Sequence, residues 1–307
     1  MSLGMLAIAT VEKSRRQDAF SRVPVPALAP LIAAAFAVGQ PVFAHLIGIL
    51  RWDQCFCGGA EEGWGLGLTA VLWYTAIAVP AGVLLARRII GRPLRARPSE
   101  FVSGIVPAAL GAMAATPVVA ALARTAVVPG VDYPGVVAAF SVPVGVGIGV
   151  LAAMAALASA AVVRGLLASW LWVWSVGLVS AVLLRIAHSD TAQPLGGVDL
   201  GFAEGWVADG LRALGDLGWL LAVLVPTVVA AFVAYRSVRS GSGAIAATIG
   251  GAAGALLLVA AYRGQGELAG TWYVVALIEL ALSVVAAIVA ALVTKLRFPA
   301  AGRVTAP

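Results

Sequence analysis

The chain has 307 residues, of which 62% are hydrophobic and only 11% charged, and its mean hydropathy is +1.01. This composition excludes a water-soluble protein and is typical of a chain whose solvent is the lipid bilayer. The formal net charge of +6 does not indicate nucleic-acid binding, because the basic residues lie in short segments between long apolar runs rather than on one soluble face.

Residues 1–26 form the first predicted segment. Its apolar stretch, residues 3–11, precedes the charges of Glu12, Lys13 and Arg15. This order is the reverse of a secretory signal peptide, which begins with positive charge. We therefore expect a cytoplasmic N-terminal segment that includes a short cytoplasmic or interfacial helix.

Eight long apolar runs follow, and charged residues bound them. Because a helix needs about 20 apolar residues to cross a bilayer, we predict spans at 27–50, 65–86, 101–123, 135–163, 165–187, 217–235, 244–262 and 272–294. Little except Arg164 separates the fourth span from the fifth, so this boundary is the least defined. The predicted fold class is an all-α polytopic membrane bundle of eight transmembrane helices over residues 27–297, followed by a cytoplasmic tail at 298–307.

The distribution of charge predicts the orientation of the bundle. With the N-terminus in the cytoplasm, all but five of the 20 basic residues lie on the cytoplasmic side, as the positive-inside rule requires. The outer segments hold most of the acidic residues. We therefore expect both termini in the cytoplasm. Arginine-rich, alanine-rich and valine-rich sequence with few lysines further favours a bacterial chain, which places it in the cytoplasmic membrane.

The two halves of the bundle, residues 27–164 and 165–297, share landmarks in the same order. Leu-Arg ends the first helix of each half, Glu-Gly-Trp lies in the next outer loop, and Ser-Gly begins the third helix. We predict a 4+4 tandem repeat whose halves are parallel, related by an axis along the membrane normal. Coincidence in an alanine, valine and glycine alphabet is the alternative.

Small residues predict where helices approach closely. Gly145 and Gly149 in the fourth span, and Gly250 and Gly254 in the seventh, have the small-xxx-small spacing of tight helix crossings. Prolines interrupt five of the predicted spans. Because each removes a backbone donor and kinks its helix, they mildly favour a transporter with a cavity or gate.

Glu279 is the one acidic residue deep inside a predicted span. An ionisable group at this depth is costly unless it is protonated, paired or hydrated, so it is a functional candidate. His45 in the first span lies at a similar depth below the outer surface, and Gln40 lies deeper on the same helix. We interpret these three residues as an intramembrane polar site, with His45 the expected partner of Glu279. The alternative is a structural hydrogen bond between two helices.

Cys55 and Cys57 lie on the first outer loop. Their spacing is too short for an unstrained mutual disulfide, and it matches neither Cys-x-x-Cys nor a paired zinc motif. A disulfide to another chain, or two free thiols, is therefore expected. A redox or metal site with His188 or Asp53 is a weaker alternative.

Two loops remain as candidate surfaces. The cytoplasmic loop after the second span carries a basic cluster that we expect to hold anionic lipid head groups or an acidic partner, or only to anchor the topology: Arg87, Arg88, Arg92, Arg95 and Arg97. In the outer loop at 188–216 a four-residue repeat predicts a short helix lying on the membrane surface; the repeat is Phe202, Trp206, Gly210 and Leu214. Trp170, Trp172 and Trp174 are expected in the inner interfacial belt.

The sequence contains no Walker A loop, no His-Glu-x-x-His motif and no acidic pair typical of a Mg²⁺ site, so an enzyme is the least favoured class, and no cofactor is specified. Two functions stay open. The first is a permease or flippase for a small or lipid-like substrate. The second is a non-catalytic membrane subunit or scaffold, and either a protein partner or a second copy of the chain could join it.

Overall fold

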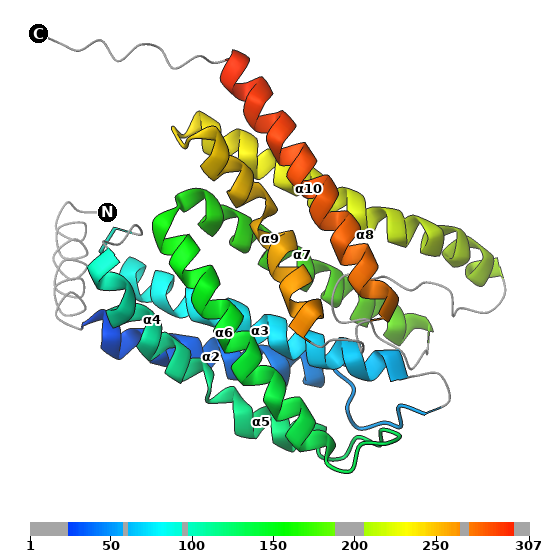
Figure 1. Cartoon of the computed structure of the whole chain (residues 1–307). Helices are drawn as coiled ribbons and strands as arrows, with labels where there is room; N and C mark the ends of the chain where they lie inside the picture. Colours follow the sequence, from blue (N-terminus) through cyan, green and yellow to red (C-terminus); the bar gives the residue numbers. More distant parts are fainter. Residues whose placement is uncertain (1–23, 58–60, 94–97, 188–205, 265–269, 298–307) are drawn as a thin grey trace, which may run out of the picture.

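The computed structural model describes residues 24–57, 61–93, 98–187, 206–264 and 270–297, and the regular elements in these ranges are helices (Figure 1). In chain order they are α2 (Val25–Leu46), α3 (Glu61–Ile89), α4 (Pro98–Ala112), α5 (Ala115–Ala123), α6 (Pro134–Ala158), α7 (Ala160–Ala187), α8 (Trp206–Arg239), α9 (Ala244–Gly264) and α10 (Gly270–Arg297). Within the described residues, seven helical stretches are long and apolar enough to cross a membrane. The chain is therefore a multi-pass integral membrane protein.

Seven of the eight predicted spans coincide with these stretches to within a few residues. They are α2, α3, the α4–α5 pair, α6, α7, α9 and α10. The remaining predicted span, the sixth at 217–235, lies inside α8, whose first side chains fall outside the described part. An all-helical membrane bundle is thus confirmed, and the count of eight spans stays a prediction. The proposed N-terminal helix lies outside the described residues, as does the C-terminal tail.

The third span is broken into α4 and α5 at Met113 and Ala114. Pro117 explains the break, because a proline has no N–H to give to the carbonyl four residues earlier and its ring collides with that carbonyl. The carbonyl concerned is that of Met113, which instead accepts a tighter bond from the Thr116 N–H at 3.0 Å. The kink expected from this proline is therefore a short interruption of the helix.

The boundary between the fourth and fifth spans lies at Ser159, earlier than the sequence indicated. Ser159 is extended, with φ −142° and ψ 119°, and its N–H caps the end of α6 by bonding the carbonyl of Ala155. Arg164, taken as the separator, is consequently inside the second turn of α7. Arg164 is therefore a residue of helix α7 and does not belong to a connecting loop.

Helix α3 is the central helix of the first half. It packs against α2, α4, α6 and α9, and every side chain from Trp64 to Pro80 is buried. Trp73 and Tyr74 are among the largest fully buried side chains of the described part. A helix that is apolar on all sides needs such an enclosed position.

The small-xxx-small faces lie at helix crossings, as predicted. A Cβ on Gly149 would lie 2.5 Å from the carbonyl oxygen of Ala76 in α3, and one on Gly250 would lie 2.5 Å from the carbonyl carbon of Ala161 in α7. Only glycine permits this approach of backbones. All of these contacts are within one chain.

Helix α8 corrects the prediction for the second long outer loop. The four-residue repeat was expected to form a separate helix on the membrane surface, but the backbone from Trp206 is continuous with the rest of α8. Its 34 residues extend for about 50 Å. The periodicity therefore belongs to the long helix α8 instead of to a separate helix. Helices α8 and α10 lie side by side, away from α2 and α4 (Figure 1).

The two halves use the same pairs of helices for packing. In the first half α2 contacts α3 and α4, while α6 contacts α3 and α5; in the second half α7 contacts α8 and α9, while α10 contacts α8 and α9. The sequence landmarks are less regular. Leu50-Arg51 follows the end of α2, whereas Leu184-Arg185 lies inside α7. The tandem repeat therefore stays a prediction.

Candidate functional site

Glu279 lies on the buried face of α10 and is only 7% exposed. The same face of α10 carries small buried residues: Ala276 one turn before Glu279, and Ser283 and Ala287 after it. Helix α10 packs against α8 and α9. The carboxyl group is thus directed into the protein. This orientation is the one expected for a carboxyl group in a hydrocarbon environment.

Tyr262 on α9 is the polar neighbour that the sequence did not indicate. Its side chain is 2% exposed, and it lies close enough to Glu279 for the two groups to interact electrostatically. One turn along α10, the hydroxyl of Ser283 is buried without a hydrogen-bond partner among the described residues. The polar groups in this region are therefore not locked into a complete hydrogen-bond network.

His45 is not the partner of Glu279 in this structure. Its Nδ1 lies 2.9 Å from the carbonyl oxygen of Leu50, beyond the last turn of α2. Within the described residues no hydrogen bond or ion pair joins His45 to Glu279. His45 instead stabilises the turn in which Gly48 adopts a positive φ of 84°, a conformation that glycine enters without steric cost.

Gln40 is at the centre of a buried hydrogen-bond cluster that joins three helices. Its Nε2 donates to the carbonyl oxygens of Phe36 and Tyr74, each at 3.2 Å. Its Oε1 accepts from the indole N–H of Trp170 at 3.0 Å and of Trp174 at 3.1 Å. These bonds use both donors and both acceptor positions of the amide. Gln40 is therefore a structural link between α2, α3 and α7, separate from Glu279.

Aromatic rings enclose this cluster. The ring of Tyr74 stacks on that of Trp174 with centroids 5.5 Å apart, and Phe36 and Phe43 contact Trp170 and Trp174 respectively. The prediction that these two tryptophans belong to an interfacial belt is corrected, because their N–H groups point to a buried amide instead of to a membrane surface. Trp172, between them, faces the groove between α7 and α8.

The cysteine loop is held in an extended conformation. The N–H of Phe56 donates to the carbonyl of Val127 at 2.8 Å, and the N–H of Val127 donates to the carbonyl of Gln54 at 3.2 Å. Successive side chains of an extended segment alternate, so Phe56 is buried against Trp64 while the two cysteines share the exposed face.

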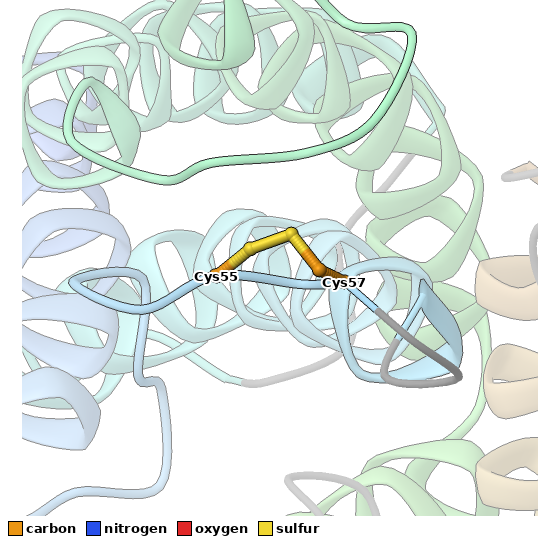
Figure 2. The surroundings of a disulfide bond; sticks show 2 residues. All are labelled: Cys55 and Cys57. Atoms are coloured by element: carbon orange, nitrogen blue, oxygen red, sulfur yellow. A yellow bond between two sulfur atoms is a disulfide. The ribbon is translucent and has the colours of Figure 1, made fainter.

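Cys55 and Cys57 form a disulfide with each other (Figure 2). The expectation of free thiols or of a bond to another chain is thereby corrected. The two Cα atoms lie 5.3 Å apart, inside the usual range for a disulfide and closer than the roughly 6.6 Å of a fully extended strand. Sequence spacing alone did not reveal this geometry. His188, the alternative metal ligand, lies outside the described residues.

The disulfide gives a direct test of orientation. An impermeant maleimide should label Cys55 and Cys57 in intact cells only after an impermeant reductant has opened their bond, because both thiols then face the outside. A Cys55→Ser, Cys57→Ser variant is the blank. Labelling that still requires cell lysis after reduction would reverse the predicted topology.

The basic loop after α3 is only partly available for ligands. Arg87 is 3% exposed, and its Nε donates to the carbonyl oxygen of Pro93 at 2.9 Å. Arg87 therefore closes the turn at the end of α3, and its place in a lipid-binding cluster stays a prediction. Arg88 and Arg92 are exposed, whereas Arg95 and Arg97 lie outside the described residues.

Two of the hollows between helices in the described part bear on function. One of about 400 Å³ lies between α2, α3 and α7, with Phe36, Pro80 and Trp170 among its lining residues and Arg88 at its edge. The other, of about 810 Å³, is a groove between α7 and α8. Both are lined chiefly by apolar side chains, as expected for surfaces that face lipid.

No known protein family, curated protein or solved structure matches this chain. Its function is therefore argued from its residues and their geometry. Among the described polar groups, Gln40 has a complete set of bonds and His45 bonds a local backbone carbonyl. Glu279 is the remaining intramembrane candidate for chemistry that changes state.

Proposed function

We propose that the protein is a permease or flippase for a small or lipid-like substrate. The observation that carries the proposal is the burial of Glu279 within a membrane-spanning helix where α8, α9 and α10 pack together. Among the described residues no ion pair neutralises this carboxyl group. A scaffold has no need for an acidic residue at such a position, whereas a transporter uses one to exchange a proton or to bind its cargo.

The chemistry follows from the cost of charge in hydrocarbon. An unpaired carboxylate is expensive there, so the carboxyl group must be protonated, hydrated or bound to a ligand in each state of the protein. Tyr262 and Ser283 supply hydroxyl groups nearby. A cycle in which the site alternately opens to water and closes would therefore couple protonation of Glu279 to movement of α8 and α10.

Interrupted helices provide places for such movement. Pro226 lies inside α8, on the helix that packs beside α10, and it leaves the carbonyl four residues earlier without its usual helical donor. The break between α4 and α5 and the extended Ser159 before α7 are further interruptions of the helical backbone. Their positions between rigid helices suit hinges.

For localisation we propose the bacterial cytoplasmic membrane with both termini in the cytoplasm. The support is the clustering of cations at one end of the bundle. This end comprises the end of α3, the beginning of α7 and the ends of α8 and α10: Arg87, Arg88, Arg164, Arg236, Arg239, Lys295 and Arg297. Such asymmetry sets orientation in bacterial membranes.

Replacing Glu279 with Gln tests the proposal. Proteoliposomes with a nitrobenzoxadiazole-labelled phospholipid should show pH-dependent transbilayer movement, measured as loss of fluorescence to external dithionite. The Gln variant should slow this movement about tenfold or more and remove its pH dependence, because Gln cannot exchange the proton. Asp132→Asn, at an exposed loop position, is the matched control and should retain the rate.

Two results would count against the proposal. If the Gln variant has the normal rate but a lower unfolding midpoint, Glu279 serves only a helix contact. If the wild-type protein moves neither labelled phospholipid nor a panel of small solutes, the result favours the alternative function, a non-catalytic membrane subunit. That alternative draws its support from the enclosed α3 and the fully bonded Gln40, which make the first half a static platform.

A further inference from the structure

The groove between α7 and α8 combines one basic end with an apolar wall. Its volume is about 810 Å³, and none of the described residues that line it is acidic. Three arginines, one from the beginning of α7 and two from the end of α8, form what we call the arginine end: Arg164, Arg236 and Arg239. Leu167, Leu171 and Phe232 are part of the apolar wall.

Hydrogen bonds hold two members of the arginine end in place, one across the groove and one within α8. Arg164 Nη1 donates to the hydroxyl of Ser240 at 2.7 Å and to that of Ser237 at 3.2 Å, so it links α7 to α8. Arg239 Nη1 donates to the hydroxyl of Tyr235 at 3.0 Å, and its guanidinium lies 5.8 Å from the centroid of that ring. Two of the three guanidinium groups are thus oriented before any ligand arrives.

Three cations around one hollow repel one another, and water screens part of this repulsion at the exposed Arg236 and Arg239. An anion placed among them removes this cost. Guanidinium groups match the oxygen atoms of a phosphate, to which they can donate two hydrogen bonds each. The charge and the donors therefore favour a phosphate group at the arginine end.

The apolar wall favours a ligand that continues into the membrane. From Arg164 to Ser175 the groove follows α7 for about 16 Å by helical rise, and the side chains of Leu171 and Phe232 are exposed along it. A free phosphate would leave this surface unused, whereas an acyl chain would cover it.

We infer that the groove binds an anionic phospholipid of the leaflet at the cationic end of the bundle, with its phosphate at the arginine end and an acyl chain against the apolar wall. This site is separate from the basic loop after α3. It does not depend on transport, because a lipid bound here would also join α7 to α8 in a protein that moves nothing.

Native mass spectrometry of the detergent-purified full chain tests the inference, with phosphatidylglycerol and phosphatidylcholine of identical acyl chains as probes. The wild-type protein should retain phosphatidylglycerol in preference to phosphatidylcholine. Arg236→Gln with Arg239→Gln should lower retention of phosphatidylglycerol by about tenfold or more. Arg164 is left unchanged, because its bonds to Ser237 and Ser240 also support the fold.

The matched control removes two arginines from the opposite end, Arg124→Gln with Arg263→Gln, both at exposed positions. It has the same net charge as the test variant and should retain phosphatidylglycerol as the wild type does. Equal retention of the two lipids by the wild type, or equal loss in both variants, would overturn the site. Release of phosphatidylglycerol by millimolar inorganic phosphate would overturn it as well, because it would assign the arginine end to a free anion.

Discussion

Replacing Gly250 with leucine should destabilise the protein by about 3 kcal/mol, at the upper end of the cost of overpacking. At the crossing of α7 and α9, no flexible side chain can move aside to make room for the leucine, because the nearest atoms are backbone atoms and the Cβ of Ala161. A Cβ at Gly250 would lie 2.5 Å from the carbonyl carbon and 2.6 Å from the carbonyl oxygen of Ala161, and a Cβ at Gly165 would meet the carbonyl oxygen of Gly250. The helices must therefore separate, which exposes the rest of their interface.

The measurement is equilibrium unfolding in mixed micelles titrated with dodecyl sulfate. Gly147→Leu is the matched control, because it makes the same substitution on an exposed face of α6 where a Cβ would find nothing within 4 Å. The control should be unchanged or slightly more stable, since glycine is a poor helix residue. If both variants unfold alike, the close crossing of α7 and α9 does not limit stability.

The spans were predictable because the bilayer imposes a length and a polarity on each of them. The local features were predictable only where a residue type determines them. Pro117 accounts for the break before α5, whereas the boundary at Ser159 has neither a proline nor a charge to mark it. The cysteine spacing was misleading because sequence separation does not fix the distance between the two Cα atoms, which is 5.3 Å here and inside the range for a disulfide.

Partners across helices could not be predicted, because one sequence does not specify which faces meet. Glu279 was expected to be buried, but its neighbour Tyr262 was not identified. Trp170 and Trp174 offered a signal that was not used. Their spacing of four residues places both indole groups on one face of α7, where a single acceptor such as Gln40 can bind them together.

The charged residues of the groove between α7 and α8 could not be grouped from the sequence either. Arg164, Arg236 and Arg239 were informative in sequence only as markers of topology. Their common position depends on the antiparallel packing of α7 against α8, which brings the beginning of one helix beside the end of the other. From the sequence, the charge of the three arginines was therefore interpreted only as a marker of orientation. The apolar surface beside them was interpreted only as lipid contact.

Replacing Gln40 with leucine should destabilise the protein by about 2–4 kcal/mol, the loss of four hydrogen bonds at the modest value that each has inside a membrane protein. The two indole N–H groups would remain buried without their acceptor, and leucine offers nothing in its place. Unfolding in dodecyl sulfate measures the loss. Gln54→Leu, which removes a half-exposed amide from a loop, should stay within about 0.5 kcal/mol of the wild type.

A double-mutant cycle with Trp170→Phe distinguishes a direct hydrogen bond from a general packing defect. Trp170→Phe alone should cost about 1 kcal/mol, because it removes one of the four bonds and keeps an aromatic ring against Phe36. If Gln40 and Trp170 bond directly, the double variant should lose less than the sum of the two single losses. Strict additivity would mean that the two side chains contribute independently, and Gln40 would then not be the link that holds α7 against α2 and α3.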